Sequence, residues 1–226
     1  AEYEKLTAVI EKFFWDEEKG AYIDSFTSGR RNVTRHANIF AILFSIADET
    51  KQEKILKNVL ENDEIPAITT PYFNFFELDV LCRMGKLTEV LDKIRSYWGG
   101  MLDLGAVTFW EEYDPSVPKE EQYDMYGDHF GKSLCHAWAA SPIYFLAKYF
   151  AGLDLVNKDG VTYILKPQMQ YFTELDCTLP VGSNGVVRLV WDGEILEITP
   201  NVDGGILELG EQKLSLVRGE TRRVKI

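Results

Sequence analysis

Cysteine, histidine and basic residues are scarce in this sequence, and each shortage excludes a class of function. The 226 residues contain three cysteines and three histidines. The cysteines, Cys82, Cys135 and Cys177, are widely spaced and odd in number, so they form neither a CxxC metal clip nor a disulfide framework. With 24 basic and 36 acidic residues the net charge is -12. Without a basic cluster such a chain repels phosphate backbones, and nucleic acid is not an expected partner.

Long hydrophobic runs are also missing. The longest, residues 39–47, contains Ser45 and is far shorter than the roughly 20 residues that cross a bilayer. No membrane span is expected. The chain starts at Ala1 inside an amphipathic segment and lacks the pattern of a signal peptide. Two origins fit this start: a chain from which a leader was removed, or an excised piece of a longer protein.

Apolar and aromatic residues are plentiful. The apolar fraction of 46% is enough for a full core, in one large domain or two smaller ones. The aromatic fraction of 13% exceeds what a small core needs. Because pyranose rings stack on flat apolar side chains with polar tips, this composition is compatible with a carbohydrate ligand.

Helical spacing of apolar residues extends to about residue 152. It predicts a half-buried helix at the N-terminus, where apolar side chains fall at i, i+3, i+4, i+7 and i+8 from Leu6 to Phe14. Gly85 and Gly152 are placed as helix stops. The same periodicity predicts five further helices, over residues 35–47, 52–60, 72–84, 88–97 and 134–150.

Two connections between the predicted helices are long, over residues 15–34 and 98–133. Loops of about 15 to 35 residues without regular structure are uncommon unless they carry function. We therefore expect functional residues in these segments.

Alternating apolar and polar residues replace the helical spacing from about Val161 onward. The stretch VVRLVWDGEILEIT predicts two strands joined at Asp192 and Gly193, a strong hairpin signal. Strands then recur about every ten residues, the rhythm of a β-sandwich or jelly roll. The predicted domains are helical hairpins over residues 1–152 and an antiparallel β domain over residues 153–226.

The stretch GAVTFWEEYDP, residues 105–115, places two aromatic rings directly before Glu111 and Glu112. Glycoside hydrolysis uses carboxylates, one as proton donor to the leaving oxygen and the other as nucleophile or as base for water. Adjacent rings would help to exclude competing water from such a carboxylate. An alternative is structural: two glutamates at a helix start, favoured there by the macrodipole, with the aromatics anchoring the loop.

The histidines give weaker signals. His136 lies at the entry to the last predicted helix, with Ser133 as a candidate N-cap, and is interpreted either as a core or capping residue or as a sugar ligand. His36 and His129 have no metal-ligand spacing with it, so neither a metal nor a cofactor is expected. Asn32-Val33-Thr34 has the form of a glycosylation sequon, a triplet that is common by chance.

Four successive stretches resemble the C-terminal half of bacterial α-L-rhamnosidases, in the same order and with comparable spacing. The resemblance spans about residues 70–191 and is more specific than any single motif. It implies the second half of an (α/α)6 barrel, six helical hairpins in a ring, followed by a C-terminal antiparallel β domain. The stretches are TPYFNFFELDVLCRMG, YWGGMLDLGAVTFWEEYDP, YGDHFGKSLCHAWAASPIYFLAKYFAGL and GSNGVVRLVW.

The resemblance also implies roles for three residues. Glu111 matches the glutamate that acts in the family as general base of an inverting hydrolase. His136 matches the histidine that contacts the bound rhamnose, and Trp110 would line the pocket. Glu112 is not expected to replace Glu111. The implied partner is a rhamnose-containing oligosaccharide or glycoside.

Two departures from the family limit what the chain can do alone. The acid segment of the family, resembling DxPxRDExxGWxGD, has no counterpart here, and only about six of twelve barrel helices are present. We therefore expect a fragment that carries the base without the acid, and self-association through apolar faces left uncovered. A third, small departure is Val107, where a small or hydroxylated residue is usual; it should affect packing rather than chemistry.

Two other functions remain open on the sequence. One is a non-catalytic carbohydrate-binding or structural module, in which the same aromatics hold sugar without turnover. The other is a different glycan-active enzyme on the same helical ring, such as a glucuronyl hydrolase or a phosphorylase. The absence of an arginine-rich site for a uronate or phosphate weakens the latter.

Overall fold

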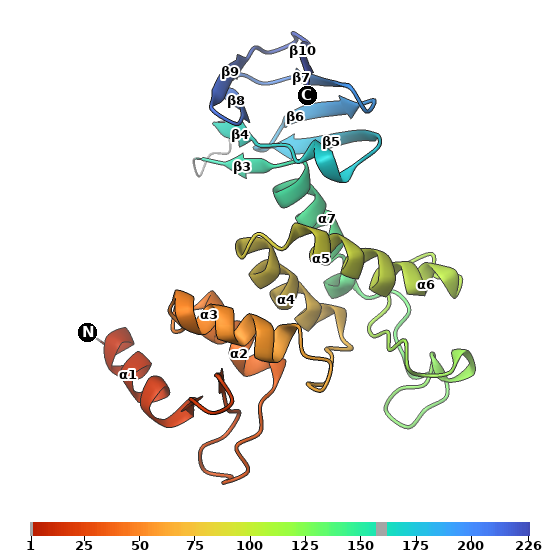
Figure 1. Cartoon of the computed structure of the whole chain (residues 1–226). Helices are drawn as coiled ribbons and strands as arrows, with labels where there is room; N and C mark the ends of the chain where they lie inside the picture. The colour runs from red at the N-terminus through yellow and green to blue at the C-terminus, as the bar shows by residue number, and fades with distance from the viewer. Residues whose placement is uncertain (1, 157–161) are drawn as a thin grey trace. The chain divides into compact units, whose positions relative to one another are not determined.

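The computed structural model describes residues 2–156 and 162–226 and divides into two compact units, Ala1–Ala140 and Ser141–Ile226 (Figure 1). Helices form the first unit, and two sheets dominate the second. The predicted fold class, helices followed by a β region, is confirmed at this level. The last helix groups with the second unit, and the predicted domain boundary at residue 152 stays a prediction.

The first unit contains six α-helices among its described residues. Pro71 occupies the first turn of α4, where its missing N–H costs nothing, and the Asp48 side chain caps α3 by accepting from the Lys51 N–H. In chain order the elements are α1 (Glu2–Phe14), β1 (Trp15–Asp16), β2 (Ala21–Tyr22), α2 (Arg35–Leu43), α3 (Glu49–Ile55), η1 (Leu56–Leu60), α4 (Pro71–Arg83), α5 (Leu87–Lys93), η2 (Ile94–Trp98), α6 (Gly99–Asp103), η3 (Lys119–Glu121) and η4 (Ala137–Ala139).

The two largest errors in the predicted helix boundaries each have a local reason. The connection predicted to start at Trp98 starts only after α6, because the helix continues through Gly99 and Gly100. A Cβ on Gly100 would lie 2.3 Å from the Tyr113 hydroxyl, so this glycine permits close packing rather than ending a helix. The last helix begins at Ser141 and not at residue 134, because Pro142 is tolerated in a first turn but not in a helix interior.

A buried ion cluster joins three elements of the helical unit. The Arg35 guanidinium on α2 lies 3.3 Å from Glu77 Oε1 on α4, and their side chains are 8% and 3% exposed. Lys93 on α5 also pairs with Glu77. The Arg35 side chain donates further to the backbone carbonyl of Leu60 at 2.8 Å. The cluster therefore fixes α2, α4 and α5 to one another and to the end of η1.

The second unit starts with a helix and continues as two four-stranded sheets. One sheet has the order β10-β7-β6-β5 and the other β3-β4-β8-β9. The prediction of an antiparallel β domain is wrong at one pair: β4 and β8 are parallel, because the chain between them passes through the other sheet, and the other pairs are antiparallel. Its elements are α7 (Ser141–Phe145), η5 (Leu146–Phe150), β3 (Leu153–Leu155), β4 (Tyr163–Leu165), η6 (Met169–Tyr171), β5 (Leu175–Val181), β6 (Gly185–Trp191), β7 (Ile195–Pro200), β8 (Gly205–Leu209), β9 (Gln212–Leu216) and β10 (Arg222–Lys225).

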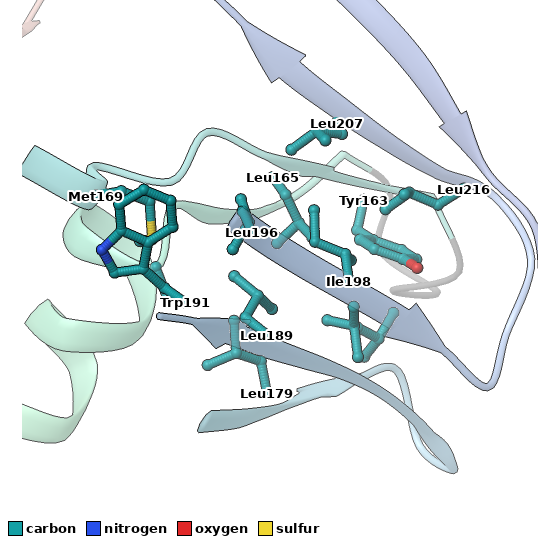
Figure 2. Packing of buried hydrophobic residues seen from close by; sticks show 13 residues of the cluster. Tyr163, Leu165, Met169, Leu179, Leu189, Trp191, Leu196, Ile198, Leu207 and Leu216 are labelled. Atoms are coloured by element: carbon teal, nitrogen blue, oxygen red, sulfur yellow. The ribbon is translucent and has the colours of Figure 1, made fainter. Parts of the chain in front are cut away.

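Both sheets contribute to one hydrophobic core, shown in Figure 2. Alternate residues of β6 and β7 point into it, and Tyr163, Leu189 and Ile198 are fully buried there. The predicted hairpin is confirmed: β6 and β7 pair with Trp191 opposite Leu196, and Gly193 has the positive φ (95°) that its turn requires. Among residues 2–156 and 162–226, no helix is long and apolar enough to cross a membrane.

Candidate active site

The site lies in the long segment after α6. Two stretches of this segment, one around Glu111 and one around Ser133, are joined by backbone hydrogen bonds but form no regular sheet. The Glu111 N–H donates to the Ser133 carbonyl at 2.9 Å, and the His136 N–H donates to the Phe109 carbonyl at 2.8 Å. The Thr108 hydroxyl also donates to the Leu134 carbonyl. These bonds bring Glu111 and His136 together although they are far apart in sequence.

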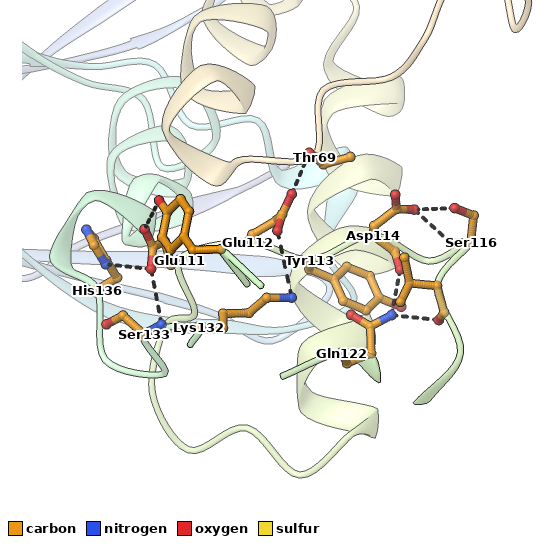
Figure 3. A network of polar contacts seen from close by, with 12 residues as sticks. Thr69, Glu111, Glu112, Tyr113, Asp114, Ser116, Gln122, Lys132, Ser133 and His136 are labelled. Atoms are coloured by element: carbon orange, nitrogen blue, oxygen red, sulfur yellow. Dashed lines mark hydrogen bonds and ion pairs between the residues drawn. The ribbon is translucent and has the colours of Figure 1, made fainter. Parts of the chain in front are cut away.

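The Glu111 carboxylate is held by donors on both oxygens (Figure 3). The Tyr126 hydroxyl donates to Oε1 at 3.2 Å, and the Ser133 backbone N–H donates to Oε2 at 3.1 Å. His136 Nδ1 lies 3.8 Å from Oε2, beyond hydrogen-bond distance. Glu111 is only 7% exposed, whereas the His136 side chain is 31% exposed. The arrangement presents an oriented carboxylate beside a more accessible imidazole.

The neighbouring Glu112 faces a different environment. Its Oε1 accepts from the Thr69 hydroxyl at 2.9 Å, and its Oε2 lies 4.0 Å from Lys132 Nζ (Figure 3). The Lys132 side chain is 4% exposed, and this burial lowers its pKa, against the opposing effect of the nearby carboxylates. Glu112 therefore ties the segment to the start of α4 and balances a buried charge, while Glu111 has a separate set of contacts.

Aromatic side chains around the site differ in accessibility. Trp110 is 3% exposed and packs edge-on against Tyr123, with ring centroids 5.6 Å apart. Trp138 is 42% exposed and stacks on His136 at 4.2 Å, and Tyr72, 43% exposed, lies 5.3 Å from Trp138. Trp138 and Tyr72 are thus accessible to a ligand, whereas Trp110 is buried.

Sequence reasoning missed two residues of this arrangement and gave a third another role. Trp138 stands two positions after His136 in the CHAW stretch and could have been found there. Ser133 was expected to cap a helix, but its N–H contacts Glu111 and the helix begins only at Ser141. Nothing in the sequence around Tyr126 pointed to a functional role; the Gly127 that follows it indicated only a turn.

The other predicted features have separate contacts. His36 packs edge-on against Phe73 at 4.4 Å, and His129 Nδ1 lies 2.6 Å from Asp124 Oδ1. In the part of the chain that the structure describes, no group of three or more His, Cys, Asp or Glu side chains could hold a metal ion. Among the cysteines, Cys82 is buried and Cys135 is exposed.

Comparisons with known proteins identify the family of the chain and its fold. Residues 1–150 match the model of the bacterial alpha-L-rhamnosidase 6 hairpin glycosidase domain. The chain is similar to the crystal structure of a GH78 family rhamnosidase of Bacillus sp. GL1, with a TM-score of 0.74 and 24% identity over 92% of this chain and 22% of that one. It is also similar to the alpha-L-rhamnosidase from Dictyoglumus thermophilum, with a TM-score of 0.64 and 20% identity over 92% of this chain and 23% of that one.

The two solved structures share the fold of this chain, which spans less than a quarter of the length of either. No curated protein sequence matches it.

Proposed function

The chain belongs to the bacterial α-L-rhamnosidase family of six-hairpin glycosidases, and from this premise we propose that it forms part of an inverting α-L-rhamnosidase in which Glu111 is the general base. The observation that supports this role is the pair of donors on the Glu111 carboxylate, which orient it beside the accessible imidazole of His136. A base must be oriented in this way to direct a water molecule at a sugar carbon.

In the proposed reaction, Glu111 takes a proton from water as the water oxygen attacks C1 of rhamnose. The bond from C1 to the leaving oxygen breaks, and that oxygen keeps the electron pair and takes a proton from a second carboxylic acid. An inverting site needs the two carboxyl groups about 6.5–9.5 Å apart, to leave room for the water. His136 would contact the sugar, and Trp110 would support the wall behind Glu111.

We propose that the acid lies in a part of the enzyme outside this chain. Two facts support this: the chain spans less than a quarter of its solved neighbours, and its sequence has no counterpart of the family's acid segment. In that larger enzyme the helical unit would form half of an (α/α)6 ring and the two sheets a β-sandwich domain. The substrate would be a glycan or glycoside with terminal α-L-rhamnose.

The isolated 226-residue chain is expected to be nearly inert toward an aryl α-L-rhamnoside. Loss of general acid assistance typically costs about 10²–10⁴ in rate, and the absent half of the ring would also contribute sugar contacts. The complete enzyme should hydrolyse the same substrate and release β-L-rhamnose first, which proton NMR of the anomeric signal detects. Retention of configuration, or rapid hydrolysis by the chain alone, would contradict the proposal. Binding of rhamnose without turnover by the complete enzyme would favour a non-catalytic module.

We also propose that the chain alone self-associates through its N-terminal helix. No residue of α1 is buried, and Leu6 and Val9 are 59% and 48% exposed on the stripe that the sequence predicts to be half-buried. Sedimentation velocity should show a dimer or larger species, and the double variant Leu6→Lys, Val9→Lys should shift it toward monomer. Val107→Lys, at a 95% exposed site in the segment after α6, is the control. A monomer at every concentration would refute self-association.

A further inference from the structure

Tyr126 sits at the centre of a tight turn that the sequence does not favour. The backbone groups of Met125 and Asp128 exchange two hydrogen bonds of 3.0 Å, which close a two-residue turn over Tyr126 and Gly127. Both central residues have positive φ, 55° for Tyr126 and 81° for Gly127. Turns of this kind favour Asn-Gly, Asp-Gly or Gly-Gly, because a bulky side chain is strained in the left-handed region.

Packing does not compensate for this strain. Tyr126 is 83% exposed, so little of its ring is removed from water. The contact that its position does provide is the hydrogen bond from its hydroxyl to Glu111 Oε1, at 3.2 Å. Gly131 allows the loop to close in this way. A Cβ on Gly131 would lie 2.2 Å from the Met125 carbonyl oxygen, so the backbone at residue 131 can approach Met125 this closely only as glycine.

We propose that Tyr126 is a positioning residue for Glu111, and that the strained turn exists to bring its hydroxyl to the carboxylate. The inference rests on the proposed role of Glu111 as general base. With Tyr126 on Oε1 and the Ser133 N–H on Oε2, rotation of the carboxylate about its own axis is restricted. The remaining lone pairs then point in a fixed direction, as activation of a single water requires.

The electrostatics of the pair support this role. The hydrogen bond to Glu111 and the charge of its carboxylate raise the pKa of Tyr126. The phenol therefore remains a proton donor throughout the neutral range and does not compete with Glu111 as a base.

A spectroscopic experiment on the chain itself tests the contact. With ¹³Cζ-labelled tyrosine, the Tyr126 signal should titrate above the ordinary value of about 10. Glu111→Gln should shift that titration downward, because the negative partner is lost. The signal is assigned by its absence in Tyr126→Phe, with Tyr123→Phe as the control. An identical Tyr126 titration with and without the Glu111 charge would overturn the proposal.

Kinetics of the complete enzyme test the consequence. Tyr126→Phe keeps the ring and the strained turn, and is expected to lower kcat about 10- to 100-fold while KM changes by less than about threefold. Tyr123→Phe, which removes a hydroxyl three residues away, should leave kcat unchanged. Tyr126→Asn relieves the strain, so it should raise the thermal midpoint of the chain and yet lower kcat. A residue with a purely structural role would not separate stability from turnover in this way.

The outcomes distinguish the two proposals. If Glu111→Gln leaves turnover intact, the proposed function fails. If Glu111→Gln abolishes turnover while Tyr126→Phe retains full kcat, the proposed function stands and the role of Tyr126 is refuted.

Discussion

Glu111→Gln in the complete enzyme should lower kcat by about 10²–10⁴, the range attributed to a general base. The amide oxygen can still accept from the Ser133 N–H, and the amide NH2 can donate to the Tyr126 hydroxyl oxygen. The fold around it should therefore be kept, but an amide cannot take a proton from water. KM should change little, because His136 and the open aromatic rings remain. Steady-state hydrolysis of an aryl α-L-rhamnoside measures both constants.

Glu112→Gln is the matched control, one residue away and with the same change of atoms. Its Oε1 contact to Thr69 can survive, since an amide oxygen also accepts a hydrogen bond. The buried Lys132, however, loses the carboxylate 4.0 Å away, so we expect lower stability of this enzyme together with near-normal kcat for each folded molecule. Equal losses of kcat in the two variants would contradict the assignment of the base to Glu111.

Local signals predicted the elements of this fold better than their junctions. Asp192-Gly193 specified its hairpin because the turn needs positive φ at one position, and Gly152 ended η5 for a related reason, with φ of 76°. The helix predicted to end at residue 97 instead continues through Gly99 and Gly100, and the close contact of Gly100 with Tyr113 is a tertiary feature. A glycine in a sequence does not reveal which of these reasons applies.

The candidate site divides in the same way. The roles of Glu111 and His136 were predicted through a resemblance in sequence, and the structure places His136 Nδ1 3.8 Å from Glu111 Oε2. Their partners could not be read from the sequence. The Ser133 contact comes from backbone pairing between distant segments, and the Tyr126 contact depends on a turn that its own sequence disfavours. The burial of the aromatic rings could not be predicted from the sequence either, since Trp110 is buried and Trp138, the same residue type in a similar motif, is exposed.

Glu77→Gln should be the most destabilising of the conservative substitutions in the helical unit. Glu77 faces the buried Arg35 guanidinium at 3.3 Å, and Lys93 approaches the same oxygen. Removing the negative partner leaves Arg35 charged at a site where its side chain is 8% exposed. Breaking a buried pair in this way typically costs about 3–5 kcal/mol, a large part of the stability of an ordinary domain.

The control for this variant is Glu17→Gln, which makes the same chemical change in the same unit. Glu17 pairs with Lys54 at 3.2 Å, but the two side chains are 74% and 43% exposed, and water replaces such a pair at little cost.

Urea unfolding followed by far-UV circular dichroism reports mainly on the helices. We expect a much lower midpoint for Glu77→Gln and an almost unchanged one for Glu17→Gln. Arg35 also donates to the Leu60 carbonyl, so loss of the Glu77 charge should loosen the end of η1 together with α2 and α4. Coincident midpoints would show that the buried cluster contributes no more than a surface ion pair.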